Sequence, residues 1–307
     1  MHFIVTGGAG FIGSHVTERL LNQGCKVTVV DNLTTGSLKN LPNHSHLKFF
    51  KKNILYSQQE DYQQPIDGIV HLAATPSVKT SWLKPLEIHH NNLSATVAVI
   101  QLCQVLKIPR LVFASSAAVY GNQTQLPISE SHTTHPISPY GLQKLSSEQY
   151  ASLFAQQLNL SFISLRFFNV FGPRQVPDSP YSGVISIFTN IMKQNLPITI
   201  YGDGKQTRDF IYVKDVAIAI EKALTIPLPN SSSIICNLGT GKTTSLLRLV
   251  DILQSCFPQW NSKINFAPAR IGDIQHSQAD ISQAQSVLGF APQYSIESAM
   301  NLFVKSL

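Results

Sequence analysis

Short apolar runs alternate with longer segments of helical periodicity over about the first 170 residues of the chain. The short runs are typical of β-strands and the longer segments of amphipathic helices. Strand-like runs cover Phe3–Val5, Val27–Val30, Gly68–Leu72, Leu111–Ala114 and Phe162–Leu165, and helix-like segments include Ile12–Gln23, Leu93–Leu106 and Gly141–Leu158. Strands that alternate with helices of this length form βαβ units. We therefore predict an α/β fold with a doubly wound parallel sheet.

The pattern changes after Gly172, where Pro173, Pro177 and Pro180 indicate a loop. Two later runs, Phe210–Val213 and Ile234–Leu238, again look like strands, and Ser295–Leu307 has the N-cap and apolar spacing of a short helix. We expect the chain to return to its first domain before it ends. The predicted division is 1–171 with about 209–240 for the first domain, and 172–208 with 241–307 for a smaller α/β domain.

Charge and composition narrow the class of partner. The formal net charge of the 307 residues is +6, which favours an anionic partner. The basic residues form no run and do not alternate with aromatic ones, so we expect a phosphate-bearing small molecule and no nucleic acid. The chain has no apolar run of membrane-spanning length, and MHFIVTGG lacks the features of a signal peptide. We therefore expect no membrane contact and a cytoplasmic location.

Cysteine and histidine residues give no sign of a metal centre. The four cysteines, Cys25, Cys103, Cys236 and Cys256, include no CxxC pair, and the histidines lack ligand spacing. We predict free thiols and no bound metal.

A glycine-rich segment, TGGAGFIG, follows the first strand and opens the first helix. Gly7, Gly10 and Gly13 suit a tight turn, a close approach of the backbone to a pyrophosphate, and helix–strand contact. Asp31 follows eighteen residues after Gly13, at the end of the second strand. A carboxylate there can accept hydrogen bonds from ribose hydroxyls and would repel a 2′-phosphate, which favours NAD over NADP. Such glycines also occur in ordinary turns, but strand, loop, helix and aspartate together predict a Rossmann-type NAD-binding domain.

Candidate catalytic residues lie further along the chain. Tyr140 and Lys144 are four residues apart on a predicted helix, so they share one face. Ser116 lies just after the predicted strand Leu111–Ala114, in SSAAVYG. A tyrosine beside an ammonium group and a cationic nicotinamide can act as a base, with the serine on the same substrate hydroxyl. The alternative is a surface helix pair without function.

These motifs together resemble the extended short-chain dehydrogenase/reductase family, and within it the UDP-hexose 4-epimerases. The resemblance runs nearly from end to end and also includes His71-Leu-Ala-Ala74, Leu165-Arg-Phe-Phe-Asn169, Tyr201-Gly-Asp-Gly204, Arg208-Asp209-Phe210 and Arg270-Ile-Gly-Asp273. It implies a cofactor site made of Gly7, Gly10, Phe11, Ile12, Gly13, Asp31, Asn32, Asn53, Ile54, Leu72, Ala73, Ala74, Asn91, Tyr140, Lys144 and Phe168. It implies a nucleotide-sugar site made of Ser77, Ser116, Asn169, Tyr201, Arg208, Arg270, Asp273 and Ser277.

Two departures from the family pattern affect the cofactor side. Asn53 stands where relatives have aspartate, although an amide can still accept a hydrogen bond from adenine. Pro76 stands where many relatives have a small or basic residue, so the resemblance does not fix the geometry of the loop on the nicotinamide side. The arginines Arg208 and Arg270 suit a diphosphate, and the alternative for both is a structural salt bridge.

The reaction follows from what the chain lacks. Related dehydratases and decarboxylases resemble this chain but place an acidic residue just before the Val-Tyr-Gly element, where Ala117 and Ala118 stand here. Elimination requires a positioned acid, so the resemblance implies a 4-epimerase that oxidises C4, lets the keto sugar turn, and returns the hydride with NAD held tightly. A dehydratase, decarboxylase or reductase of the same family stays an alternative, and so does a non-catalytic NAD-binding regulator.

Substrate choice and assembly are two further expectations from the resemblance. A small residue at Ser277 leaves room for an N-acetyl group, so we expect UDP-N-acetylglucosamine and UDP-N-acetylgalactosamine as substrates, with UDP-glucose and UDP-galactose also possible. Apolar residues beyond one face of two predicted helices favour a homodimer: Val97, Val99, Ile100, Leu145, Leu153 and Phe154. Deeper burial within one subunit is the alternative.

Overall fold

The computed structural model describes residues 1–175, 183–269 and 274–307. Its largest element is a seven-stranded parallel sheet with the strand order β11-β6-β5-β4-β1-β2-β3. These strands are β1 (His2–Thr6), β2 (Lys26–Asp31), β3 (Leu47–Lys51), β4 (Gly68–His71), β5 (Arg110–Ser116), β6 (Ser161–Phe167) and β11 (Ser233–Leu238). The order reverses between β1 and β4, and ligands bind at such a switch point in doubly wound sheets. The predicted α/β fold class is confirmed.

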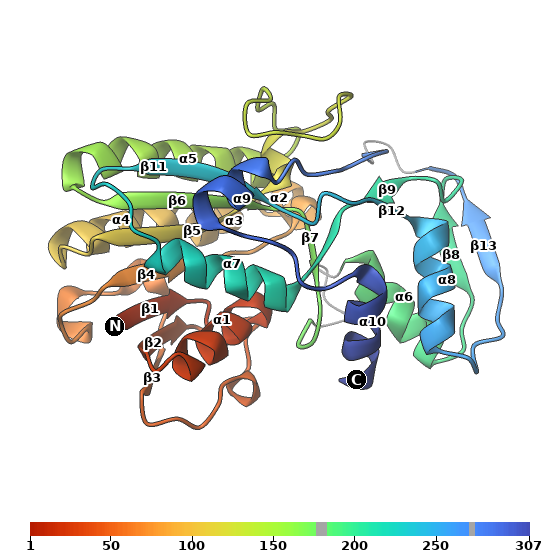
Figure 1. The fold of residues 1–307 in the computed structure, drawn as a ribbon, viewed down its shortest axis with the longest axis horizontal. Coiled ribbons are helices and arrows are strands. Elements are labelled where there is room, and N and C mark those ends of the chain that lie inside the picture. The colour runs from red at the N-terminus through yellow and green to blue at the C-terminus, as the bar shows by residue number, and fades with distance from the viewer. Residues whose placement is uncertain (176–182, 270–273) are drawn as a thin grey trace.

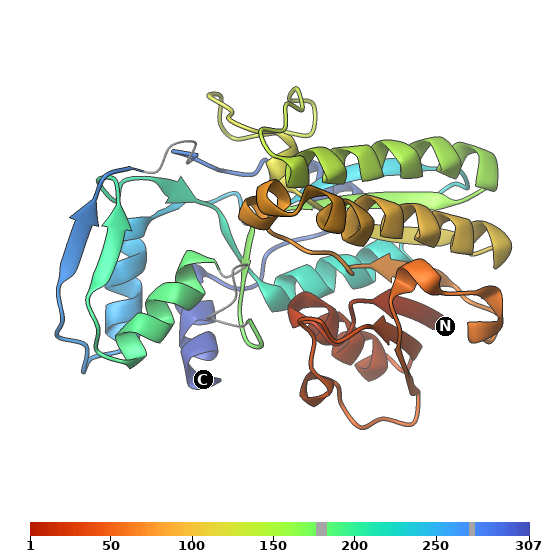
Figure 2. The same ribbon diagram turned by 180° about the vertical axis from the view of Figure 1, so that it is seen from behind.

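Helices cover both faces of this sheet, which is why its strands are nearly continuous apolar runs. One face carries α1 (Phe11–Asn22), α7 (Val213–Thr225) and α9 (Ser282–Leu288), packed in one apolar cluster with β1 and β6. The other face carries α4 (Ala95–Val105) and α5 (Pro139–Leu158), which lie side by side in Figure 2. The short helices α2 (Val78–Leu83) and α3 (Pro85–His89) pack beside α5.

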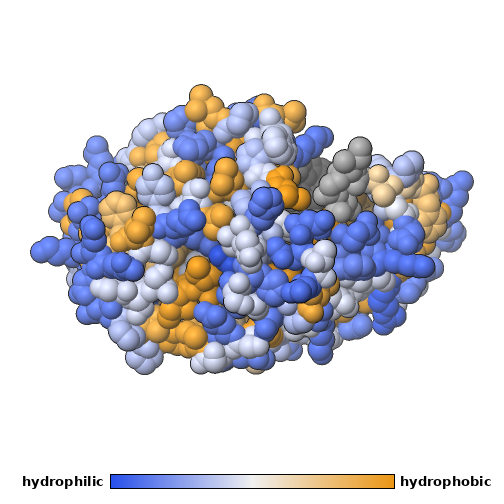
Figure 3. Space-filling view, turned by 90° about the horizontal axis from the view of Figure 1, so that it is seen from above, coloured by the Kyte–Doolittle hydropathy of each residue, from blue (hydrophilic) through white to orange (hydrophobic). Residues whose placement is uncertain are grey.

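A smaller α/β region lies at the other end of the molecule, on the right in Figure 1. Its apolar cluster joins α6 (Val184–Lys193), α8 (Leu246–Cys256) and α10 (Ile296–Lys305). The short strands pair in twos: β7 (Asn169–Phe171) with β10 (Phe210–Tyr212), β8 (Ile198–Tyr201) with β13 (Ile264–Ala267), and β9 (Thr207–Arg208) with β12 (Thr244–Ser245). Seen from above, apolar side chains form several separate groups among polar ones (Figure 3).

Single helical turns connect the main elements. They are η1 (Leu38–Asn40), η2 (Ile54–Tyr56), η3 (Gln59–Asp61), the π-helical turn η4 (His90–Ser94) and η5 (Ala117–Val119). None of the helices in the described part of the chain is long and apolar enough to cross a bilayer.

The structure differs from the predicted elements mainly at their ends. The predicted helix Leu93–Leu106 begins with the π-helical turn η4 and becomes α-helical only at Ala95. The predicted strand Phe210–Val213 ends at Tyr212, because Val213 begins α7, and this strand pairs with β7 outside the large sheet. The returning run near 234–238 does join the sheet, as β11 beside β6. The division into two domains stays a prediction.

Candidate functional site

The glycine-rich segment forms the turn between β1 and α1. Gly7 has a φ of +68°, and a Cβ atom there would lie 2.8 Å from the backbone nitrogen of Ala73. A Cβ on Gly13 would overlap the carbonyl oxygen of Gly7. No side chain caps α1 at Gly10, which leaves the amide groups of the first turn for a ligand. The turn has the shape that a pyrophosphate requires.

Asp31 closes this turn from the end of β2. Its carboxylate accepts hydrogen bonds from the backbone N–H of Ala9 at 3.0 Å and of Leu33 at 2.8 Å. It lines the same cleft as Asn32. Two oxygens offer about four acceptor positions, so the carboxylate keeps capacity for ribose hydroxyls beside the two backbone bonds.

The predicted adenine contacts line the same cleft. Asn53 caps η2, and its side-chain oxygen accepts the N–H of Leu55 at 3.0 Å. An amide oxygen has two lone pairs, so one lone pair of Asn53 and its side-chain NH₂ group remain for a ligand. Ile54 lines the cleft with it.

One continuous cleft brings together fifteen of the sixteen predicted cofactor residues. Those that line it are Gly7, Gly10, Phe11, Ile12, Gly13, Asp31, Asn32, Asn53, Ile54, Leu72, Ala73, Ala74, Asn91, Tyr140 and Lys144. Phe168 does not line it but packs in a separate apolar cluster with Val119 and Ile128, while its neighbour Phe167 faces the cleft. Successive residues of an extended chain point to opposite sides, which explains why Phe167 and not Phe168 faces the cleft. The residues present therefore fit a dinucleotide.

The catalytic candidates meet where α5 begins. Ser138 caps the helix and Pro139 occupies its first position, and the Tyr140 N–H donates to the Ser81 hydroxyl at 3.1 Å. Tyr140 and Lys144 are both buried and line the cleft. Ser116, at the end of β5, lies close enough to Tyr140 to lower the pKa of the phenol. Tyr140 and Lys144 thus share one site with Ser116 beside it, although the cleft is lined by its neighbour Ser115.

The protonation states follow from burial. Desolvation raises the pKa of Tyr140 to about 12, against a hydrogen bond with Ser116 that lowers it. Desolvation lowers the pKa of Lys144 to about 8, against the negative charge of Glu148, which raises it. Lys144 Nζ donates to the Ala114 carbonyl at 2.6 Å and lies 5.9 Å from the centre of the Tyr140 ring. Tyr140 is therefore a phenol here, and its ionisation requires positive charge beyond that of Lys144.

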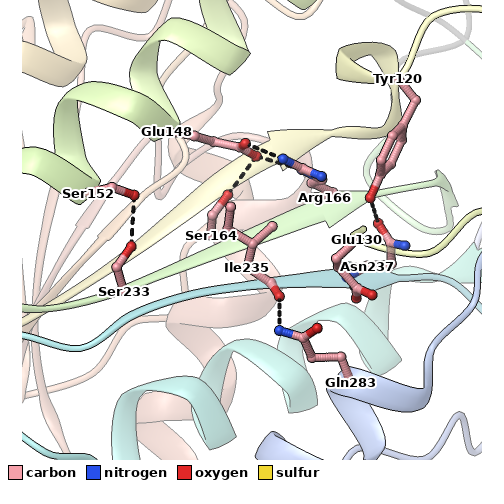
Figure 4. A network of polar contacts seen from close by, with 10 residues as sticks. All are labelled: Tyr120, Glu130, Glu148, Ser152, Ser164, Arg166, Ser233, Ile235, Asn237 and Gln283. Atoms are coloured by element: carbon pink, nitrogen blue, oxygen red, sulfur yellow. Dashed lines mark hydrogen bonds and ion pairs between the residues drawn. The ribbon is translucent and has the colours of Figure 1, made fainter. Parts of the chain in front are cut away.

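A buried ion pair lies one turn further along α5. Arg166 on β6 donates to Glu148 through Nε at 3.0 Å and Nη2 at 2.7 Å, and Ser164 adds a bond at 2.9 Å (Figure 4). The Arg166 guanidinium also lies 4.8 Å from the centre of the Tyr120 ring. The Tyr120 hydroxyl donates to Asn237 on β11 at 2.6 Å. This network joins the catalytic helix to the sheet beneath it.

Three predicted nucleotide-sugar residues cluster around Asp209. Asn169 donates its backbone N–H and its side-chain amide to the Asp209 carbonyl, at 3.0 and 3.3 Å. The Arg208 guanidinium donates to the backbone carbonyls of Thr207 and Gln275, at 2.9 and 3.4 Å. Ser277 donates its N–H to Thr207 at 3.2 Å. Hydrogen bonds thus join three segments that are distant in the sequence.

The remaining predicted substrate residues differ in position. Tyr201 is 38% exposed at the end of β8, where its carbonyl accepts from Gln206 at 2.7 Å. Ser77 is buried and caps α2, accepting the Thr80 N–H at 3.0 Å, so its hydroxyl serves the helix. Arg270 and Asp273 lie outside the described residues.

Sequence reasoning did not assign several residues that line the cleft. They are Val30, Thr34, Thr35, Lys52, Thr75, Ala95, Ala114, Ser115, Phe167, Arg174 and Gln175. Pro76, which was expected on the cofactor side, lines the cleft as well. Arg174 also pairs with Glu18 on α1 at 2.8 Å. The sequence did contain a signal for Arg174. This residue follows Gly172-Pro173 directly after β7, and loops at the carboxyl ends of strands carry ligand contacts.

Comparison with known proteins agrees with this geometry. Residues 3–239 match the family described as "NAD dependent epimerase/dehydratase family". The chain is 37% identical over 307 residues to a putative UDP-glucose 4-epimerase of Methanocaldococcus jannaschii, covering 98% of this chain and 96% of the relative.

Two solved structures extend the likeness to the fold. A UDP-N-acetylglucosamine 4-epimerase from Methanobrevibacter ruminantium, in complex with UDP-N-acetylmuramic acid, matches with a TM-score of 0.94 and 37% identity, covering 99% of this chain and 97% of that one. A UDP-glucose 4-epimerase from Thermus thermophilus, in complex with NAD, matches with a TM-score of 0.89 and 32% identity, covering 100% and 98%.

The chain therefore belongs to the NAD-dependent epimerase/dehydratase family. Within that family it is an NAD-dependent enzyme of the UDP-hexose 4-epimerase group, to which it is similar over its full length.

Proposed function

We propose that the protein inverts C4 of UDP-N-acetylhexosamines and also accepts UDP-glucose and UDP-galactose, with Tyr140 as the base. One observation carries the proposal: Tyr140 and Lys144 line the cleft that the glycine turn opens, and Ser116 lies close enough to Tyr140 to lower the pKa of its hydroxyl. This places a proton acceptor beside a dinucleotide site, as hydride chemistry at an alcohol requires.

Each residue of the site has a separate task. NAD supplies the hydride acceptor and a positive charge when it is bound. Tyr140 takes the proton of the C4 hydroxyl, and Ser116 holds that hydroxyl by a hydrogen bond. Lys144, fixed on the Ala114 carbonyl, favours the phenolate by its charge. Arg208 binds the diphosphate and Asn169 the nucleotide, so that the keto sugar can turn about its link and accept hydride on the other face.

The residues before Tyr120 support epimerisation over elimination. Ala117 and Ala118 form η5, and Gly141 lies against the Ala118 carbonyl, where a Cβ on Gly141 would come within 2.5 Å. Alanine carries no acidic group, so neither residue could give a proton to a leaving hydroxyl. A reductase would consume NADH, and a regulator would need no buried Tyr140–Lys144 pair.

Ser277 supports the acetylated substrates. It is 8% exposed and lies against Thr207, next to Arg208. A serine fills little volume, whereas a large aromatic residue would exclude an acetamido group at a cost of about 1–3 kcal/mol. The names of the relatives include both UDP-N-acetylglucosamine and UDP-glucose epimerases, so the choice must be measured.

The test is product analysis after separate incubation with UDP-N-acetylglucosamine and UDP-glucose. We expect both epimers from both substrates without net NADH formation, and a keto or deoxy product would contradict epimerisation.

Ser277→Tyr is expected to lower kcat/KM for the acetylated pair by about tenfold or more, with Ser277→Ala as the control that adds no volume. Equal loss for both substrate pairs in Ser277→Tyr would remove Ser277 as the selecting residue.

We also propose a homodimer through α4 and α5. Leu142 and Leu153 on the outer side of α5 are 55% and 68% exposed, and Val105 on α4 is 52% exposed. Pairing two such helices from each subunit would bury these side chains in a four-helix interface. The cytoplasmic location stays a prediction from the sequence.

A further inference from the structure

The function described so far does not use His71, the last residue of β4. Its side chain is almost completely buried, with 1% exposed. Each ring nitrogen lies beside a threonine hydroxyl: Nδ1 is 2.8 Å from Thr6 Oγ1, and Nε2 is 3.2 Å from Thr96 Oγ1. A buried imidazole with two such partners has a defined tautomer, because each hydroxyl carries only one proton.

The Thr6 hydroxyl determines the state of Nδ1. Thr6 Oγ1 accepts the backbone N–H of Ala73 at 3.2 Å and shares the N–H of Leu72, also at 3.2 Å, with the Thr6 carbonyl. A hydroxyl has two lone pairs and one proton. Since its lone pairs face these two N–H groups, the hydroxyl proton is donated to Nδ1 of His71, and this nitrogen is an acceptor.

The other nitrogen therefore carries the ring proton and donates it to Thr96. The Thr96 hydroxyl in turn donates to the Asn92 carbonyl at 2.9 Å and accepts from the Ser147 hydroxyl at 3.3 Å. The opposite direction would give Thr6 three donors, and it would take the Thr96 proton from Asn92. Only the first direction, from Thr6 through His71 to Thr96, gives each of the two threonine hydroxyls an acceptor for its proton and no more than two donors.

The surroundings of the ring keep it neutral. Burial, with the positive charge of Lys144 in addition, lowers the pKa of His71 to about 3. The ring stacks on Phe113 with 5.8 Å between centres, and Lys144 Nζ lies 4.7 Å from the centre of the same Phe113 ring. A second cation beside the catalytic lysine is thereby avoided.

We propose that His71 is a positioning residue, which as the Nε2–H tautomer directs the Thr6 hydroxyl onto the Leu72–Ala73 backbone and so fixes the wall of the cofactor cleft. This backbone is the one that a side chain at Gly7 would strike, since a Cβ there would lie 2.8 Å from the Ala73 nitrogen. The wall and the glycine turn must keep their spacing for a dinucleotide to lie between them. The inference rests on the proposed placement of NAD in this cleft.

The first test uses matched variants and the affinity of the NAD-free protein for NAD. Thr6→Val keeps the shape of the side chain but removes the hydroxyl, whereas Thr6→Ser keeps the hydroxyl. We expect Thr6→Val to weaken NAD binding about tenfold and Thr6→Ser to stay within about twofold of the wild type, because without the hydroxyl the Ala73 N–H loses its acceptor and the Leu72 N–H keeps only the Thr6 carbonyl. Equal affinities for both variants would overturn the inference while leaving NAD in its proposed place, and no binding to the wild type would instead overturn that placement.

Two substitutions of His71 separate its two nitrogens. Asparagine places an amide near Nδ1, where its oxygen can accept the Thr6 proton, and glutamine places its amide near Nε2. We expect His71→Asn to retain NAD better than His71→Gln, with unchanged KM for the nucleotide sugar in both variants. The reverse order would show that the Thr96 side of the ring, and not the Thr6 side, supports the cleft, and would contradict the proposal.

A spectroscopic measurement tests the tautomer without cofactor or activity. Long-range ¹⁵N–¹H spectra of uniformly labelled protein, assigned by comparison with His71→Asn, should show His71 as the neutral Nε2–H form from about pH 5 to 8. A protonated Nδ1, in either the neutral or the cationic ring, would overturn the proposal.

Discussion

At the scale of the residue, burial shifts the pKa values of two ionisable groups of the site in opposite directions. Burial raises the pKa of Tyr140 to about 12 and lowers that of Lys144 to about 8, so it favours the neutral form of each. The four-residue spacing predicted that both lie on one face of α5. It could not predict that Lys144 binds the Ala114 carbonyl, because that contact depends on how α5 packs against β5. The same limit applies to Phe168, which the structure places outside the cleft.

Removing the phenolic oxygen tests the role of Tyr140 directly. We expect Tyr140→Phe to bind NAD as the wild type does and to lose about 10²- to 10⁴-fold in kcat, because the general base is absent. Titration with NAD and a coupled assay of epimer formation give the two quantities. Tyr150→Phe, also on α5 but 45% exposed, is the control that should stay fully active. Near-normal turnover in Tyr140→Phe would assign the base elsewhere.

At the scale of the element, periodicity was sufficient for the sheet and its covering helices but not for their ends. The π-helical turn η4 precedes α4 because tertiary contacts hold it: the Asn92 side chain binds the Thr75 N–H at 2.8 Å and Gln143 at 3.0 Å. Such turns are frequent at functional sites, and Asn91 of this turn lines the cleft. Apolar spacing carries no information on these polar contacts.

The ion pair between Glu148 on α5 and Arg166 on β6 is expected to affect how kcat/KM depends on pH. Glu148 raises the pKa of Lys144 against burial, so removal of its charge must lower that pKa further. We expect Glu148→Gln to move the alkaline limb of kcat/KM to lower pH, since Lys144 then loses its proton earlier. The neutral ring of His71 and the phenol of Tyr140 add no opposing charge there. Rates measured between about pH 6 and 10 give the limb.

Stability provides the control for this variant. Glu148→Gln leaves Arg166 buried without its carboxylate, which typically costs about 3–5 kcal/mol. The double variant Glu148→Gln with Arg166→Met should regain much of the urea stability and keep the shifted limb. Ser164→Ala removes only one hydrogen bond to Glu148 and should leave the limb in place. A limb at the wild-type pH in Glu148→Gln would show that the carboxylate does not act on Lys144.

At the scale of the whole molecule, the residues expected to bind the nucleotide sugar show what could be predicted only through the resemblance. Asn169, Arg208 and Ser277 are far apart in the chain, and no periodicity relates them. Asp209 unites their segments: its buried carboxylate accepts the N–H groups of Thr240 at 2.8 Å, Gly241 at 2.9 Å and Ala279 at 3.1 Å. This clamp joins the large sheet to the segment that carries Ser277.

Exposed apolar side chains on α5 show where the proposed dimer can be tested. Val99 and Ile100 are buried in the chain's own core, whereas Leu153 on α5 is 68% exposed. Burying one such leucine contributes about 1.5–3 kcal/mol, and in a twofold dimer each side chain counts twice. We expect light scattering at micromolar concentration to give a dimeric mass for the wild type and a monomeric mass for Leu153→Glu. Leu196→Glu, at a site 48% exposed in the smaller region, should remain dimeric, because its charge lies away from α4 and α5. A wild-type monomer would contradict the dimer, and a dimer that only Leu196→Glu disrupts would place the subunit contact on another surface.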